Sequence, residues 1–269
     1  MLAHSRFFIA CSTAFLFVAA CPDSRALTID WDSVPWTNGS LINSLEVDPT
    51  RPGNDVTVAV SGNTPQLQPE LASPNPMTPA VTRAFDGGLV PGQNTLSLAV
   101  NFTNQSQVIT VTVDFSAQYA QGVTNVSFTI FDVDFSNTSG NTYQDQLTAI
   151  RAVGIDGTLI APTITTSANN TLSGTGLNQV VNGIASTTDT GANSGRGNVT
   201  ISFGTAAIRS FTFTYGSGSG TVADPTYQHI GLHDITFTPV PEMNPAWSAA
   251  LSCLAAGLLI FRHNARHRR

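Results

Sequence analysis

Acidic side chains near the centre and end of the sequence are the residues best suited to chemistry. The candidate group is Asp132, Asp134, His233 and Asp234. Two aspartates on one face of a strand lie about 6.6–6.8 Å apart, and carboxylate oxygens are ligands that Ca²⁺ prefers. The sequence therefore predicts a calcium site with Asp132, Asp134 and Asp234 as ligands, which Asp145 and Asp156 in later loops could join. The alternative left open is that these aspartates are solvated on an outward face.

The two segments that carry this group share an unusual pattern. Each alternates apolar and polar residues, and in each the apolar parity slips by one position, at Ile130-Phe131 in the segment 122–135 and across His233-Asp234 in the last segment. A β-bulge absorbs such a slip, and bulges are frequent beside binding sites. If the two strands are neighbours, the four polar residues could approach one another.

Other chemistries find less support in the sequence. His229 and His233 are four residues apart and could suggest zinc, but no third ligand accompanies them. A Gly-x-Ser-x-Gly elbow is absent, and the region after residue 26 has no lysine and no cysteine before Cys253. Its only glutamates are Glu46, Glu70 and Glu242, so a glycosidase pair would depend largely on aspartate. We therefore expect no enzymatic activity.

Aromatic residues offer a second kind of binding surface. Their side chains could form a surface on which sugar rings stack. The alternative is that most of them belong to the core or the sheet edges. The residues concerned are Trp31, Trp36, Tyr119, Tyr143, Tyr215 and Tyr227.

The charge of the central region limits its partners. Residues 27–245 contain five arginines, no lysine and sixteen acids, a net charge of −11. Phosphates would repel such a surface, so we expect no nucleic-acid partner, while cations and neutral polymers remain. All three cysteines, Cys11, Cys21 and Cys253, lie outside this region, so its stability must come from core burial rather than disulfides.

Period-two alternation predicts an all-β fold for residues 27–238. Short alternating segments are separated by turn-forming Gly, Pro, Asn and Asp, and no segment keeps a helical period. Ten to twelve such strands favour a β-sandwich, with a jelly roll as its type. The clearest predicted strands are 27–31, 56–60, 96–102, 109–115, 122–135, 199–203, 211–215 and 230–237.

Connections between these strands lead to three further predictions. The short polar link 103–106 predicts that 96–102 and 109–115 form a hairpin. The segment 62–93 contains six prolines, so it is expected to be a surface loop or a flap over one sheet rather than a central strand. The polar segment 163–197 is expected to form one or two exposed edge strands or a mobile loop.

The first 26 residues have the organisation of a signal peptide. Arg6 precedes an apolar stretch at 7–20, and Ser24-Arg25-Ala26 places small residues at the spacing that signal peptidase recognises. Cleavage would make Leu27 the first mature residue. A competing interpretation is a lipobox ending at Cys21, whose thiol would be acylated.

The C-terminal segment 239–269 reads as a sorting signal. It contains Val240-Pro241-Glu242, then an uncharged run at 246–261, then four arginines at 262–269. A helix of sixteen residues covers about 24 Å against a hydrocarbon core of about 30 Å, and the basic end favours a cytoplasmic C-terminus. A lasting membrane anchor is the alternative.

This order of Pro-rich break, apolar helix and basic end resembles the PEP-CTERM sorting signal of Gram-negative bacteria that make exopolysaccharide. Met243 stands where that family has a second proline. The resemblance implies processing by an exosortase-like enzyme with Val240, Pro241 and Glu242 as the recognised residues. It also implies transient insertion in the inner membrane and a final location in the cell envelope or extracellular matrix.

Three hypotheses for function follow from these patterns. The first is an exported, non-catalytic surface or exopolysaccharide-matrix protein. The second is a carbohydrate-binding module that could depend on calcium. The third is a hydrolase of extracellular polysaccharide.

Overall fold

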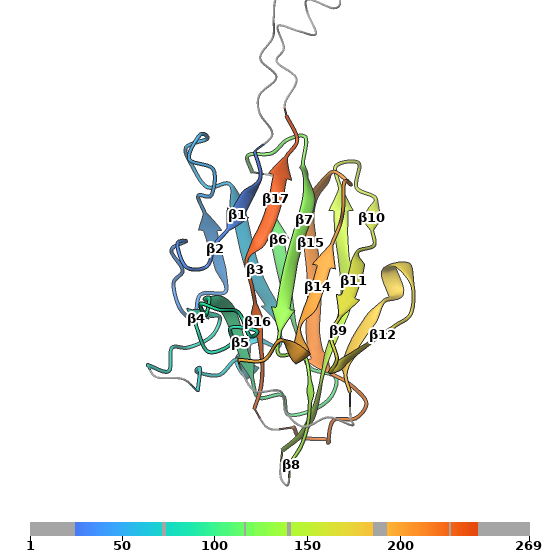
Figure 1. The fold of residues 1–269 in the computed structure, drawn as a ribbon. Helices are drawn as coiled ribbons and strands as arrows, with labels where there is room; N and C mark the ends of the chain where they lie inside the picture. The colour runs from blue at the N-terminus through green and yellow to red at the C-terminus, as the bar shows by residue number, and fades with distance from the viewer. Residues whose placement is uncertain are drawn as a thin grey trace, which may run out of the picture.

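The computed structural model describes residues 25–71, 74–115, 117–138, 141–184, 193–225 and 227–241 (Figure 1). These residues form antiparallel β-strands and three short 3₁₀ helices, Thr64–Gln66, Gly176–Asn178 and Gly195–Gly197, and contain no α-helix. The predicted all-β class is confirmed. The predicted signal peptide, except for its last two residues, and the predicted helix at 246–261 lie outside the described residues.

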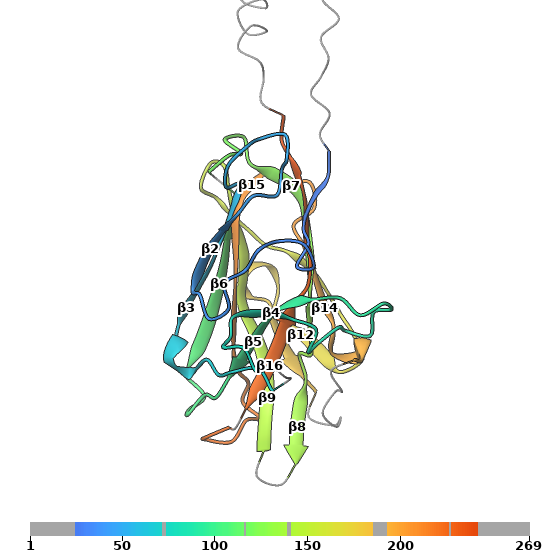
Figure 2. The same ribbon diagram turned by 90° about the vertical axis from the view of Figure 1, so that its left-hand side faces the viewer.

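The strands curl into two groups that face each other (Figure 2). The first group, which we call the β7 layer, contains the central strand β7 (Val123–Phe131), paired on one side with β14 and on the other with β17 and β16. β11 forms the edge beyond β14. On the other side, β1 pairs with β17, and β5 lies between β16 and the edge strand β4. Their bounds are β1 Leu27–Ile29, β4 Ala80–Thr82, β5 Thr95–Val100, β11 Thr163–Thr166, β14 Val199–Ser202, β16 Gln228–Leu232 and β17 Ile235–Pro239.

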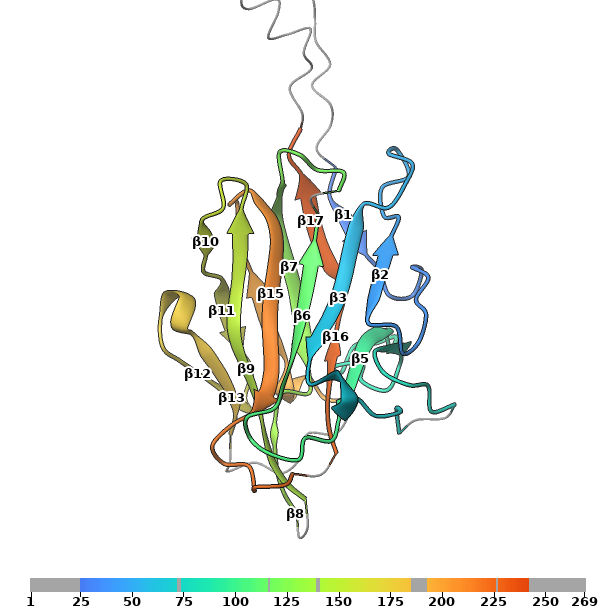
Figure 3. The same ribbon diagram turned by 180° about the vertical axis from the view of Figure 1, so that it is seen from behind.

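The second group, the β15 layer, is seen from its outer side in Figure 3. Its order is β2, β3, β6, β15, β9, with β10 and β13 on the far side of β9 and β12 beyond β13. Between the described strands of the two layers, a bridge joins Ile208 of β15 to Val123 of β7. The bounds are β2 Ile42–Leu45, β3 Val56–Gly62, β6 Val108–Asp114, β9 Asn141–Gly154, β10 Leu159–Ile160, β12 Asn170–Ser173, β13 Val180–Gly183 and β15 Ile208–Ser217; β8 (Phe135–Thr138) pairs with β9.

The core lies between the layers and follows from the alternation in the sequence. Every second residue is buried on β6 and between Phe211 and Tyr215 of β15, and the register places Phe211 opposite Val113 and Phe213 opposite Val111. Across the core, Phe128 of β7 stacks on Phe211 with ring centroids 4.6 Å apart. Burial of each such ring contributes about 1.5–3 kcal/mol, so the period-two pattern accounts for most of the stabilisation.

Both ends of the described chain lie at the same end of the molecule (Figure 1). β1 pairs antiparallel with β17, with Leu27 opposite Phe237. The sheet continues one residue beyond β17, because the Val240 amide donates a hydrogen bond of 3.0 Å to the Gly122 carbonyl. The segment predicted as a sorting signal from residue 239 therefore begins within the sheet.

The predicted hairpin of 96–102 with 109–115 is wrong. β5 pairs with β16 and β4 in the β7 layer, whereas β6 pairs with β15 and β3 in the β15 layer. The connection between them crosses from one layer to the other. Each strand has its apolar face turned to the shared core, so local alternation fits this crossing as well as it fits a hairpin.

The two irregular segments behave largely as predicted. The Pro-rich segment contributes only the edge strand β4 and otherwise covers the outer side of β5 and β16. We call its described residues, 63–71 and 74–94, the flap. Within the polar segment 163–197, β11 pairs only with β14 and β12 only with β13 among the described residues, so both are edge strands. β13, in the same segment, pairs with both β12 and β9 and is not an edge strand, which the prediction did not include.

Candidate functional site

The structure places Asp132 and Asp134 inside the protein, so their predicted outward orientation is wrong. β7 ends at Phe131, and the chain turns at Asp132, whose φ is 65°, instead of continuing through a bulge to residue 135. The next residues run between other segments: the Val133 amide donates to the Gly197 carbonyl at 3.0 Å, and a Cβ on Gly183 would lie 1.9 Å from the Asp134 carbonyl oxygen. Asp134 is completely buried.

Asp145 joins this buried region from β9, although the sequence suggested a loop. Its Oδ2 accepts a hydrogen bond of 3.2 Å from the Asp134 amide, and its Oδ1 accepts one of 2.7 Å from the Tyr215 hydroxyl. Burial, together with the charge and hydrogen bond of Asp145, raises the pKa of Tyr215 well above its usual range. The phenol therefore stays protonated and acts as a donor to the carboxylate.

Asp234 lies at a different place, between β16 and β17. The predicted slip across His233-Asp234 is confirmed, because β16 ends at Leu232 and β17 begins at Ile235. The Asp234 carboxylate accepts a hydrogen bond of 3.1 Å from the Trp31 amide, and the His233 ring stacks on Phe131 at 4.9 Å. Burial raises the pKa of Asp234 and lowers that of His233.

These strands are neighbours, as the prediction required, but their polar residues do not form one group. Among the residues that the structure describes, no three of His, Cys, Asp and Glu converge as metal ligands. Calcium binding by Asp132, Asp134 and Asp234 therefore stays a prediction. A calcium titration followed by melting temperature, with EGTA reversal, would test it.

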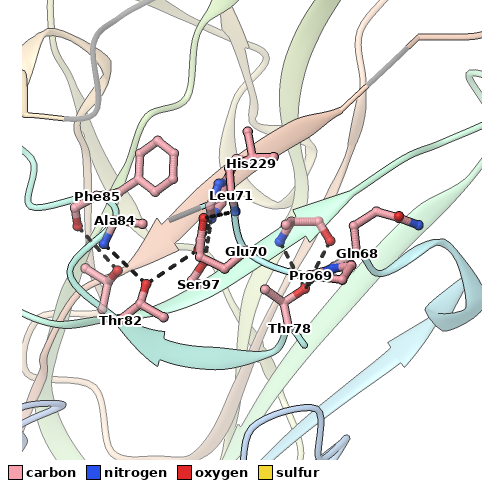
Figure 4. Close-up of polar contacts among 12 residues, drawn as sticks. Gln68, Pro69, Glu70, Leu71, Thr78, Thr82, Ala84, Phe85, Ser97 and His229 are labelled. Carbon is pink, nitrogen blue, oxygen red and sulfur yellow. Dashed lines mark hydrogen bonds and ion pairs between the residues drawn. The ribbon is translucent and has the colours of Figure 1, made fainter. Parts of the chain in front are cut away.

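A different polar cluster is the strongest candidate site in the described structure. Ser97 of β5 and His229 of β16 lie on adjacent strands, where His229 pairs with Ala99 and Gly231 pairs with Ser97. This diagonal arrangement brings both side chains to the same face of the β7 layer. The flap supplies the third member, Glu70, from above that face (Figure 4).

The flap backbone holds Glu70 in this position. The Gln68 amide donates to the Ala99 carbonyl at 2.9 Å, which fixes the flap beside β5, and the Glu70 amide donates to the Pro76 carbonyl at 2.9 Å. Opposite the flap, Gly231 leaves room, because a Cβ there would lie 2.8 Å from the Thr95 hydroxyl. Glu70, Ser97 and His229 are all buried.

Short contacts join the three side chains. The Ser97 hydroxyl donates to Glu70 Oε2 at 2.5 Å and also contacts His229 Nε2. His229 Nε2 lies 3.0 Å from Glu70 Oε2, and the Leu71 amide donates to Glu70 Oε1 at 2.9 Å. Phe85 covers the imidazole, with ring centroids 3.8 Å apart.

Burial and hydrogen bonding set the charge of this cluster. Burial alone would raise the pKa of Glu70. Hydrogen bonds from His229, Ser97 and Leu71, together with the charge that His229 carries once it is protonated in acid, outweigh burial, and the pKa of Glu70 is lowered. Burial lowers the pKa of His229, and Glu70 only partly counters this. At neutral pH we therefore assign an ionised Glu70 and a neutral His229 whose Nε2–H faces the carboxylate.

The geometry differs from that of a hydrolytic triad. In a triad, the serine and the carboxylate contact opposite nitrogens of the imidazole. Here Ser97 and Glu70 both contact Nε2, while Nδ1 is buried without a hydrogen-bond partner in the described structure. What this arrangement can do is bind or release a proton and attach the flap to the sheet.

Sequence reasoning missed this cluster, although a signal was present. β5 and β16 are buried along their whole length, and polar residues within such strands need partners. Ser97 and His229 are such residues. Their partner Glu70 comes from the Pro-rich segment, 27 positions before Ser97, and no local pattern links them.

Most of the candidate sugar-stacking residues belong to the core. Trp31, Tyr119, Tyr143 and Tyr215 are buried, which confirms the alternative interpretation for these four. The half-buried Trp36 and Tyr227 instead hold the flap: Trp36 Nε1 donates to the Pro79 carbonyl at 2.9 Å, and the Tyr227 hydroxyl donates to the Pro69 carbonyl at 3.0 Å.

Comparison with known proteins gives no relative for this chain: no family model, curated protein or solved structure matches it. Within the described residues, no helix has the length and apolar character needed to cross a bilayer.

Proposed function

We propose that this chain is an exported, non-catalytic protein of the cell surface or exopolysaccharide matrix, sorted by its C-terminal segment. The observation that carries the proposal is the tail: Val240-Pro241-Glu242, an uncharged run at 246–261 and four terminal arginines. An exosortase-like enzyme would process it while the run is held in the inner membrane. Extracellular polysaccharide is then the expected neighbour of the mature protein.

The position of the chain ends supports this proposal. Leu27 lies opposite Phe237, so the predicted signal peptide and the predicted sorting signal join the folded region at one end. Two membrane-directed segments at one end leave the rest of the molecule free to fold outside the membrane. Stability without disulfides also suits the architecture, because 38 buried apolar residues of the described part of the chain form one core cluster.

We further infer that the fold is a β-sandwich of jelly-roll type. The support is the order in which the chain visits the layers. Four short strands, β4, β8, β10 and β12, each pair with a strand next to them along the chain. The other strands from β3 onward follow the order β3, β5, β6, β7, β9, β11, β13, β14, β15 and β16, and each of these steps changes layer. Such alternation is typical of jelly rolls, in which strands consecutive along the chain lie in opposite sheets.

Intact mass of the protein from the envelope and medium of its native host tests the function. We expect a mass that begins at Leu27 and ends near Glu242. A Glu242→Ala variant should retain the tail. A Glu46→Ala variant, changed at an exposed position of the folded region, should be processed normally. A native mass that includes Arg269 would contradict processing and make the tail a lasting anchor.

A further inference from the structure

The flap is attached to the β7 layer by several neutral hydrogen bonds and one buried charged contact. The neutral bonds include Gln68 to Ala99, and those donated by Trp36 and Tyr227 to flap carbonyls. Among the described residues, Glu70 is the only acid of the flap that is buried, and its carboxylate contacts side chains of both β5 and β16. This contact is therefore the attachment that a change of protonation can alter.

We propose that Glu70, Ser97 and His229 form an acid-sensitive latch, which holds the flap on β5 and β16 at neutral pH and releases it on acidification. Release would uncover the face of the sheet that carries Ser97, Thr95 and Gly231. The latch is a conformational device of the folded protein, and it does not depend on the proposed sorting or location.

Geometry explains why a proton weakens the latch. With Glu70 ionised, Oε2 accepts from both Ser97 and His229. A proton on Glu70 would take the place of one of these donors. A proton on His229 would go to Nδ1, which is buried with no acceptor among the described residues, and a buried unsatisfied donor costs about 1–3 kcal/mol.

The direction of the pH effect follows from linkage. In the released state both side chains meet water and take up protons at ordinary pKa values, about 6.5 for histidine and about 4.3 for glutamate. In the latched state both pKa values are lower. The released state therefore binds protons more readily, so acid favours release, first below the ordinary histidine pKa and further below that of glutamate.

The other polar groups near the latch either do not titrate between neutral and acidic pH or lie outside the cluster of Glu70, Ser97 and His229. Tyr227, whose ring centroid is 5.8 Å from that of His229, has a raised pKa and stays protonated in acid. Thr82 of β4 contributes a hydroxyl 3.5 Å from Glu70 Oε2. The flap's other ion pair joins Arg83 to Asp32 at 3.5 Å and is exposed, so it contributes little.

Hydrogen exchange of the full-length chain between pH 7.5 and 4.5 tests the latch, after correction for the intrinsic pH dependence of exchange. The reporters are the amides of Gln68 and Asn101, whose hydrogen bonds to the Ala99 and Gln66 carbonyls join the flap to β5, and the reference amides are those of β6 and β15. We expect the opening constant of the flap to rise by up to about tenfold per pH unit for each proton taken up, while the reference amides stay protected.

Variants separate the latch from general acid sensitivity. Glu70→Gln and His229→Gln keep polar side chains at the site, and each should reduce the pH dependence of flap opening even if the flap opens more at pH 7.5. His233→Gln changes a half-buried histidine outside the cluster and should leave the flap's pH dependence unchanged. An unchanged pH dependence in the Glu70→Gln, His229→Gln double variant would overturn the proposal. Loss of flap and reference protection at the same pH would overturn it too.

Discussion

Replacement of Phe211 by alanine is the sharpest test of the core. Phe211 is completely buried on β15, and its ring lies 4.6 Å from Phe128 and 5.8 Å from Phe203. Removal of a buried phenylalanine ring costs about 3–5 kcal/mol, because apolar burial is lost and a cavity remains. For a folded unit of this size, each kcal/mol lowers the melting temperature by about 2–4 °C, so we expect a decrease of about 6–20 °C.

The neighbouring residue provides a matched control. Thr212 is on the opposite face of β15, where its hydroxyl donates a hydrogen bond of 3.4 Å to the Ala149 carbonyl. Thr212→Ala should cost at most about 1 kcal/mol. Urea unfolding followed by tryptophan fluorescence would measure both variants. Equal losses for Phe211→Ala and Thr212→Ala would refute the assignment of inner and outer faces on β15.

Three further predictions concern single polar groups and glycines. Tyr215→Phe removes a hydrogen-bond donor to a buried carboxylate and should lower the free energy of unfolding by about 1.5–3 kcal/mol in the same urea assay. Tyr119→Phe removes a buried hydroxyl that has no partner in the described structure, so this variant should be as stable as the unmodified protein or more stable. Asp234→Asn should raise the free energy of unfolding at pH 7, and this gain should be lost near pH 3. Burial raises the pKa of Asp234, and a carboxyl group with a raised pKa destabilises the folded state once it is ionised. A lower stability of the variant at pH 7 would contradict this reasoning. Gly87→Ala should lower the melting temperature more than Gly157→Ala: φ is positive at both, but only at Gly87 would the new Cβ meet an aromatic ring at 2.5 Å.

Alternation in the sequence predicted many of the strands but not their partners. The segments 56–60, 109–115 and 211–215 appear as β3, β6 and β15, because a strand with one buried face must place its apolar residues at every second position. β5 and β6 show why pairing could not be predicted. Their connection is short, yet the two strands lie in opposite layers, and only the packing of the whole core selects this arrangement.

The longest strand escaped prediction for a local reason. β9 contains Ala149 with φ 49°, and its register with β15 shifts between Thr212 and Thr214. This irregularity breaks the alternation, and the first half of β9 is rich in polar residues. Its aspartate, Asp145, was therefore expected in a loop, although it is completely buried beside Tyr215.

The position of the flap connects the two proposals. β16 and β17 run in sequence along β7, from Gly231 opposite Phe131 to Pro239 opposite Val123. The flap covers the β16 half, and the chain ends lie beside the β17 half (Figure 1). If the C-terminal segment is held in the membrane during export, the flap lies at the end of the β7 layer away from that attachment. If the protein also lies in an extracellular matrix, as proposed, a latch that opens in acid would then expose its sheet face toward that matrix. Flap opening measured on the tail-bearing and processed forms should therefore show the same pH dependence, because the Glu70–Ser97–His229 cluster lies away from Pro239 and Val240, the described residues from which the tail departs.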